Sequence, residues 1–187
     1  MAIVYLKRYR MQIDLRDYSL EKLSIPRHVR FHPWHYDLLE AHAEAKFHSF
    51  RNELDMNVFP CLGDADGCLR LMKEISCRQG FVPESTWLAT YRNPQTGRRE
   101  NCGTVQGVSE KFDVGMIQNI GVVKSRRGMG IGSLLIQHSL QGFLRAGIHF
   151  VTLEVTSQNS AACRLYERLG FRLLRTVYKS VEISDVV

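Results

Sequence analysis

A glycine-rich turn joins a strand-like segment to a helix-like segment in the second half of the chain. Residues 117–123, Ile-Gln-Asn-Ile-Gly-Val-Val, have the apolar and β-branched character of a strand. The sequence Arg-Gly-Met-Gly-Ile-Gly follows at 127–132, and an apolar helical pattern begins at once with Ile131, Leu134 and Leu135. Alternating glycines let backbone amides converge on an anion, and a helix start adds unpaired N–H groups and a positive dipole end. The turn therefore predicts a phosphate-binding loop within a strand–loop–helix unit.

Two better-known phosphate loops do not fit the spacing of these glycines. A P-loop requires Gly-x-x-x-x-Gly-Lys-Ser/Thr, and no lysine follows the glycines here. A dinucleotide fingerprint requires Gly-x-Gly-x-x-Gly, but its third glycine would fall on Ser133 when counted from Gly128, and on Leu135 when counted from Gly130. A flexible turn before a buried helix remains the structural alternative.

A second motif follows the strand-like run at residues 149–156. Asn159 is a favourable N-cap, and Gly170 stands where a left-handed residue commonly ends a helix, so a short helix is predicted between them. Tyr166 lies seven residues after Asn159, which places both on nearly the same side of that helix, two turns apart. Taken alone, a tyrosine at this position is typical of a core or its rim.

Together the two motifs resemble the GNAT superfamily of acetyl-CoA-dependent N-acetyltransferases. They are Arg-x-x-Gly-x-Gly at 127–132 and Asn-x-x-x-x-x-x-Tyr-x-x-x-Gly-Phe at 159–171, in the order and at the separation found in that family. The resemblance covers about residues 86–181. It implies an α+β GNAT fold, a mixed and largely antiparallel sheet flanked by helices. It also implies acetyl-CoA as cosubstrate and an amine acceptor, either a small molecule or a peptide N-terminus.

The same resemblance implies roles for individual residues. The strand that ends near Val122 would separate from its neighbour and pair with the pantetheine arm, and the amide of Ile120 would meet the acetyl carbonyl. Asn159 would bond the pantetheine, and Tyr166 would protonate the departing thiolate. The CoA pyrophosphate would be wrapped by the amides of the loop, which comprises Arg127, Gly128, Met129, Gly130, Ile131, Gly132 and Ser133.

Acetyl transfer also needs an oxyanion donor and a base. A fixed N–H aimed at the carbonyl oxygen stabilises the transition state more than the ground state. An alkylamine with a pKa near 10.4 must lose a proton before it attacks. Many family members carry a glutamate on the cofactor strand, but the matching residue here is Met116. A subgroup that acetylates protein N-termini has a glutamate twelve residues before the tyrosine within Leu-Glu-Val, and Glu154 fits that pattern. Glu154 is thus a candidate base acting through water, and a structural glutamate is an equal alternative.

The composition fits one globular domain spanning residues 1–187. The chain is 44% hydrophobic and 24% charged, which is ordinary for a single core. No apolar run approaches the roughly 20 residues of a membrane span, and the start lacks a signal-peptide pattern, so a cytoplasmic location is expected. Five cysteines without paired C-x-x-C spacing indicate neither a disulfide framework nor zinc. The histidines His28, His32 and His35 lack accompanying ligands at metal-site spacing, so no metal is expected.

The formal charge of +6 raises the alternative of a nucleic-acid binder led by the basic N-terminal segment. This signal is weak, because a CoA-binding enzyme has its own use for positive potential. Alternation over residues 5–16 predicts an extra N-terminal strand, about 3–16, with Arg8 and Arg10 on a solvated face. A further alternative is a non-catalytic CoA-binding regulatory module.

The remaining pattern predicts the order of the other elements. Acceptor-side helices are expected within residues 35–80, at 37–51 and 68–79, with a loop at 55–67 and with His42 and His48 facing solvent.

An acceptor pocket is expected at about 47–63, where Glu53, Asp55 and Asp64 could attract a cationic amine. The cofactor-binding core is expected at 86–182. Only one strand, 172–182, follows the last helix, whereas the family usually ends with two. The N-terminal strand is therefore predicted to cover the missing edge, and an exposed edge would make a homodimer plausible.

Overall fold

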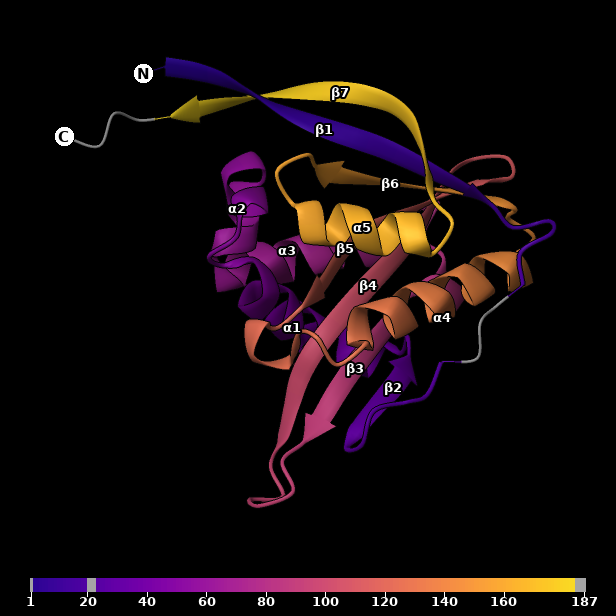
Figure 1. The fold of residues 1–187 in the computed structure, drawn as a ribbon. Helices are drawn as coiled ribbons and strands as arrows, with labels where there is room; N and C mark the ends of the chain where they lie inside the picture. Colours follow the sequence, from indigo (N-terminus) through magenta and orange to yellow (C-terminus); the bar gives the residue numbers. More distant parts are fainter. Residues whose placement is uncertain (1, 20–22, 184–187) are drawn as a thin grey trace.

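The computed structural model describes residues 2–19 and 23–183, so residues 1, 20–22 and 184–187 of the expected single domain lie outside the described part (Figure 1). The strands form one seven-stranded sheet in the order β2-β3-β4-β5-β6-β1-β7. Every adjacent pair is antiparallel except β5 and β6. The mixed, largely antiparallel sheet is therefore confirmed. The strands are β1 (Ala2–Asp14), β2 (Val29–Pro33), β3 (Trp87–Arg92), β4 (Arg99–Lys111), β5 (Val114–Val122), β6 (Phe150–Thr156) and β7 (Arg172–Ile183).

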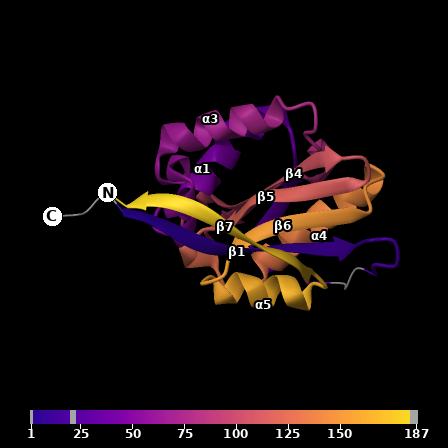
Figure 2. The same cartoon turned by 90° about the horizontal axis from the view of Figure 1, so that it is seen from above.

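Helices cover both faces of the sheet. Helices α1 and α3 lie on one face and α4 and α5 on the other (Figures 1 and 2). The larger hydrophobic core includes Leu135, Phe143 and Phe171 under α4 and α5, and a second cluster around Met72 packs beneath α1 and α3. The expected loop at 55–67 is partly wrong, because it contains a short helix and a 3-10 turn at Pro60–Gly63. The helices are α1 (Leu39–Phe50), α2 (Leu54–Val58), α3 (Ala65–Ser76), α4 (Ile131–Arg145) and α5 (Ser160–Arg168).

The N-terminal strand lies inside the sheet and not at its edge. Strand β1 pairs with β6 along residues 8–14 and with β7 along residues 2–12, so β7 becomes the edge strand. Strand β1 therefore covers the edge of β6 that the single final strand leaves open, as predicted, but it does so from inside the sheet. The final strand, β7, pairs with β1. The first half of β1 and its partner β7 form a two-stranded ribbon that extends past the end of β6 (Figure 1).

Two further expectations about exposure are wrong. Arg8, predicted to face solvent, is 5% exposed, because its face of β1 turns toward the residues of α2. His42 is fully buried, because α1 packs it against β4, where its Nδ1 lies 2.8 Å from the Thr104 hydroxyl. In both cases the partner comes from a distant part of the chain, 47 residues away for Arg8 and 62 for His42.

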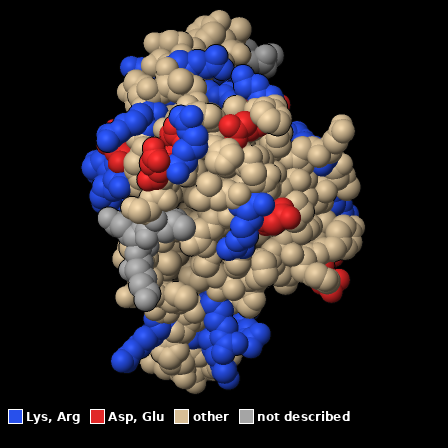
Figure 3. Space-filling view, turned by 90° about the vertical axis from the view of Figure 1, so that its right-hand side faces the viewer, with Lys and Arg blue, Asp and Glu red and all other residues tan. Residues whose placement is uncertain are grey.

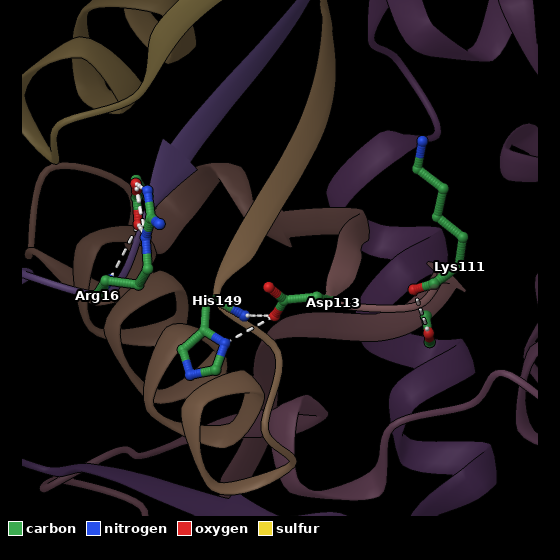
Figure 4. Close-up of polar contacts among 6 residues, drawn as sticks. Arg16, Lys111, Asp113 and His149 are labelled. Atoms are coloured by element: carbon green, nitrogen blue, oxygen red, sulfur yellow. Dashed lines mark hydrogen bonds and ion pairs between the residues drawn. The ribbon is translucent and has the colours of Figure 1, made fainter.

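A polar contact fixes the end of the sheet where β5 and β6 begin. The Asp113 carboxylate accepts hydrogen bonds from the His149 backbone N–H at 2.8 Å and contacts the His149 Nδ1 at 2.7 Å, and the two side chains point toward each other (Figure 4). The backbone hydrogen bond from His149 lowers the pKa of Asp113. Asp113 and His149 directly precede the two strands, so their contact sets the parallel register of Val114 with Phe150.

Lys46 is a fully buried lysine on α1. Its Nζ lies 3.9 Å from the Met72 sulfur, a weak partner for an ammonium group, and its side chain has no exposed area. Burial lowers the pKa of Lys46 from 10.5 to about 7. Between about pH 7 and 10.5 the unfolded chain therefore binds more protons than the folded chain at this residue, so stability increases as the pH rises through that window.

Replacing Lys46 by Met should raise the free energy of unfolding at pH 7 by about 1–2 kcal/mol, because a buried polar group becomes apolar at similar volume. The variant should also lose the increase in stability between pH 7 and 10.5 that the wild type shows. Urea unfolding at pH 6, 8 and 9.5 measures both effects, with exposed Lys73→Met as the control. The prediction would be contradicted if the free energy of unfolding changed with pH in the same way in the wild type and in Lys46→Met.

Charged side chains are distributed in separate groups over the surface. On the face seen in Figure 3, Lys and Arg gather near the two ends with a mostly uncharged region between them. The upper group is mixed with acidic residues. None of the described helices is both long and apolar enough to span a membrane.

Candidate active site

A cavity of about 620 Å³ lies where β5 and β6 part. The two strands pair in parallel only from Val114–Phe150 to Met116–Thr152, so their facing edges are unpaired beyond that point. The separation predicted for the strand that ends near Val122 is therefore present. The sheet contributes Ile117, Asn119, Ile120, Gly121, Val122, Leu153, Glu154 and Val155 to the lining of the cavity.

A β-bulge shapes the cavity wall in β5. The register passes from Gln106–Gln118 to Thr104–Gly121, so two residues of β5, Asn119 and Ile120, oppose one residue of β4. Asn119 has a φ of 49°, a left-handed conformation that asparagine tolerates better than most residues. A bulge of this kind redirects the backbone locally and leaves the extra residue outside the ladder. The bulge thus places the Ile120 backbone at the cavity wall in an irregular orientation.

The glycine-rich turn closes one end of the cavity, at the start of α4. Gly128 and Gly130 have φ angles of 78° and 80°, and a Cβ atom at either position would meet no atom within 4 Å. Gly130 is the N-cap of α4 and has no side chain to bond the first amides of that helix. The open space and the free amides fit a phosphate group, so the residues present suit the pyrophosphate of CoA.

Arg127 ties the glycine turn to the acceptor-side helices. Its guanidinium donates to the Val122 carbonyl at 2.9 Å and to the Ser49 carbonyl at 3.1 Å, and it lies 2.7 Å from a Glu53 oxygen. These contacts join the end of β5, the last turn of α1 and the segment before α2. In this conformation Arg127 positions the turn through its side chain and leaves anion contact to the backbone amides.

Helix α5 places Asn159 and Tyr166 along the other wall. The Asn159 side chain caps the helix by accepting from the Ala162 N–H at 3.2 Å, as its sequence predicts. Gly170 has a φ of 99°, which confirms the predicted left-handed end of the helix. Tyr166 is 6% exposed and packs edge-to-face on Phe171 with ring centres 6.1 Å apart. Both Asn159 and Tyr166 line the cavity.

The pKa of Tyr166 is raised well above its usual value. Burial is the main cause, and the negative charge of Asp55 adds to it. The phenol therefore stays neutral throughout the physiological pH range. The difference between the pKa of this phenol and that of a thiol, about 8.5, is therefore larger than usual. The hydroxyl is better suited to donate a hydrogen bond to a developing thiolate than to ionise fully.

Acidic residues of the acceptor side divide into two groups. Glu53 and Asp55 line the cavity together with Phe59 and Leu62, as expected for the segment 47–63. Asp64 does not line it, because its carboxylate caps α3 by accepting from the Gly67 N–H at 2.7 Å.

Glu154 lies between two arginines of β1. Its carboxylate oxygens are 3.7 Å from the Arg8 Nε and 3.9 Å from Arg10 Nη1, and Arg10 also contacts Glu110. The glutamate is half-buried and lines the cavity. Its surroundings are consistent with both alternatives from the sequence, a base that acts through water or a structural member of an ion cluster.

Nearly all residues singled out from the sequence meet at this cavity. The exceptions are Asp64, which caps α3, and Met129, which packs against the main hydrophobic core. Sequence reasoning missed Arg8, which reaches the cavity from β1, and Arg126, which bonds Glu100 at 2.8 Å and lies over the Tyr91 ring at 3.9 Å. Alternation along β1 did place Arg8 on the same face as Arg10, but that pattern did not reveal what covers the face. In the described part of the chain, no group of three or more His, Cys, Asp or Glu residues is placed to hold a metal ion.

The fold and the cavity define a class of protein in which a splayed parallel strand pair and a glycine turn form a cosubstrate cleft. A model of the acetyltransferase (GNAT) family matches residues 59–171, and the chain belongs to this family. N-alpha-acetyltransferase RimI of Mycobacterium tuberculosis is 32% identical over 139 residues, covering 65% of this chain and 82% of that protein.

Other similarities are shorter or show the fold alone. N-alpha-acetyltransferase 30 of Schizosaccharomyces pombe is 38% identical over 65 residues, covering 35% of this chain and 43% of that protein. This chain thus spans less than half the length of several curated relatives it matches. A crystal structure of a GCN5-related N-acetyltransferase from Sphaerobacter thermophilus superposes with a TM-score of 0.67 at 24% identity, covering 94% of this chain and 50% of that one.

Proposed function

We propose that this chain is an acetyl-CoA-dependent N-acetyltransferase that transfers acetyl to a primary amine by direct attack in a ternary complex. The observation that carries the proposal is the single cavity that brings together the glycine turn, the bulged edge of β5 and Tyr166. Each part meets a separate demand of the reaction, namely anion binding, oxyanion stabilisation and assistance to the leaving thiolate.

In this proposal the protein acts mainly through backbone groups. The amides from Gly128 to Ser133 bind the pyrophosphate of acetyl-CoA, whereas the Arg127 N–H donates to the Lys124 carbonyl at 3.3 Å and is not available for it. The edge of β5 through Val122 pairs with the pantetheine arm. The Ile120 N–H stabilises the oxyanion, for which the bulge supplies an orientation outside the regular ladder. Asn159 bonds the pantetheine, and Tyr166 donates to the leaving sulfur.

Glu154 is the proposed base, acting through a water molecule on the bound amine. Glu154→Gln should lower kcat/KM most at pH values where the acceptor is protonated, because deprotonation then limits the rate. A rate equal to that of the wild type from pH 6 to 9 would assign Glu154 to the structural alternative.

A peptide or protein N-terminus is the acceptor class that we favour. N-alpha-acetyltransferase RimI, which shares 32% identity with this chain, is named for this activity. An α-amino group has a pKa near 8, so it loses its proton at about 3 kcal/mol lower cost than an alkylamine with a pKa of 10.4. A chain of this kind is expected to act in the cytoplasm.

The deciding experiment is a CoA-release screen over N-terminal peptides, polyamines, amino acids and aminoglycosides, combined with calorimetry of acetyl-CoA binding. Amine-dependent release supports the enzyme, and faster release with peptides supports the favoured acceptor class. Acetyl-CoA binding without release from any acceptor would favour a non-catalytic CoA-binding module. No heat with millimolar acetyl-CoA would overturn both functions.

A further inference from the structure

Arg8 is a buried arginine that the inserted strand β1 brings to the acceptor side of the cavity. Its Nη1 donates to the Asp55 Oδ1 at 2.9 Å and to the Thr156 hydroxyl at 2.8 Å, and its Nη2 donates to the Glu154 carbonyl at 3.4 Å. The Nε is buried without a hydrogen-bond partner, although it lies 3.7 Å from the Glu154 carboxylate. A guanidinium that is 5% exposed is costly to bury, so this position must be determined by its partners.

The partners of Arg8 fix one oxygen of Asp55 and leave the other available. Asp55 Oδ1 accepts from Arg8 and also from the Thr156 hydroxyl at 3.0 Å, so the carboxylate is held from two directions. Among the described residues, no hydrogen bond reaches Asp55 Oδ2. The Asp55 side chain is 21% exposed and lines the same cavity as Tyr166, whose pKa it helps to raise. A carboxylate oxygen therefore lies in the wall of the cavity that also holds the proposed proton donor, with its orientation set and its second acceptor site open.

The ion cluster that contains Asp55 is net negative, whereas the rest of the cavity lining carries four arginines, Arg126, Arg127, Arg164 and Arg168. The ion cluster contains two guanidinium groups, from Arg8 and Arg10, and three carboxylates, from Asp55, Glu154 and Glu110, which gives a net charge of −1. Exposed Lys179 lies outside the cluster, over the ring of Phe59 at 4.1 Å, where water screens its charge. Glu53, the other acid of the segment 47–63 that lines the cavity, is paired with Arg127 at 2.7 Å, as Asp55 is with Arg8 at 2.9 Å, so the unbalanced negative charge of the cluster lies nearest Glu154.

We propose that Asp55 binds the ammonium group of the acceptor amine beside Tyr166, and that Arg8 and Thr156 act as positioning residues that hold the carboxylate for it. This inference rests on the proposed acetyl transfer and deepens it by naming the residue that selects a cationic acceptor. A hydrogen bond between an ammonium and a fixed carboxylate is charge-assisted and directional. The inserted strand thus builds part of the acceptor site, because the Arg8–Thr156 register puts the guanidinium within reach of α2.

The test compares Asp55→Asn with a matched control, Asp66→Asn, which changes an exposed acid on α3. Initial rates are measured with acetyl-CoA and a short peptide that has a free α-amino group, and acetyl-CoA binding is measured by calorimetry. Asp55→Asn should raise the KM for the peptide by about tenfold or more and leave the Kd for acetyl-CoA within twofold. Asp66→Asn should match the wild type in both the peptide KM and the Kd for acetyl-CoA.

The positioning role is tested by Arg8→Lys, because lysine keeps the charge but cannot hold Asp55, Thr156 and the Glu154 carbonyl together. Arg8→Lys should raise the peptide KM in the wild type and change it less than twofold in the Asp55→Asn background. Should the lysine variant not fold, Thr156→Val removes the other anchor of Asp55 and should show the same dependence on Asp55.

Two outcomes would overturn the inference and leave the proposed acetyl transfer intact. One is a peptide KM for Asp55→Asn equal to that of the wild type. The other is a double variant whose increase in peptide KM equals the product of the increases caused by Arg8→Lys and Asp55→Asn separately. Independent substitutions give such a product, whereas substitutions that act through one contact do not. A wild-type chain that releases no CoA with any acceptor would instead contradict the proposed function itself.

Discussion

Replacing Tyr166 by Phe is expected to lower kcat by roughly 100-fold and to leave acetyl-CoA affinity almost unchanged. Phenylalanine keeps the ring that packs on Phe171 at 6.1 Å, so the variant removes the hydroxyl and little else. Without that hydroxyl, the sulfur of CoA leaves as an unassisted thiolate inside a partly buried cleft. Stopped-flow and steady-state CoA release, with calorimetry of acetyl-CoA on the same samples, separate the chemical step from binding.

The control is Tyr178→Phe, which removes a hydroxyl from a tyrosine that is 66% exposed on the edge strand β7. Its rates should equal those of the wild type. Burial raises the pKa of Tyr166, so ionisation of this phenol should not reduce kcat of the wild type up to about pH 10. A Tyr166→Phe enzyme with kcat within twofold of the wild type would remove the tyrosine from the chemistry.

The cosubstrate side of the cavity could be predicted because its signals are local in sequence. A left-handed glycine before a helix and an asparagine N-cap each depend on a few neighbouring residues, and the structure places both as expected, with Gly130 at a φ of 80° and Asn159 bonded to the Ala162 N–H. The family resemblance added the order of the elements, which periodicity alone does not provide. These features define the half of the cavity next to α4 and α5.

The acceptor side could not be predicted to the same depth, because its residues are buried by distant partners. Alternation along β1 correctly separated two faces, but the burial of Arg8 depends on pairing with β6, about 150 residues further along the chain. His42 and Lys46 have the helical spacing of one face of α1, and only the packing of that face on β4 and α3 makes them core residues. Polar residues on an amphipathic helix are ordinarily assigned to solvent, which is why both were missed.

Replacing Gly130 by Asp is expected to weaken acetyl-CoA binding by at least about 100-fold, because it puts a carboxylate into the proposed phosphate cradle. Gly130 is the N-cap of α4, and a Cβ atom there meets open space, so no steric clash accompanies the substitution. The charge of aspartate suits the positive end of the helix, whereas the left-handed φ of 80° at this position adds a backbone cost. The loss of affinity would therefore report competition and repulsion at the anion site and not a disrupted helix.

The matched control for this substitution is Gly147→Asp. Gly147 has a φ of 73° and equally open surroundings, and it lies beyond the other end of α4, so it carries the same left-handed backbone cost without facing the cavity. In calorimetry of acetyl-CoA binding, Gly147→Asp should have the Kd of the wild type. Gly130→Asn should weaken acetyl-CoA binding less than Gly130→Asp does. The difference between the last two variants should shrink at high salt, because screening reduces charge repulsion at a solvent-accessible site. Equal affinities for the two aspartate variants would show that the amides of this turn do not hold the pyrophosphate, and the proposed cosubstrate site would fall with them.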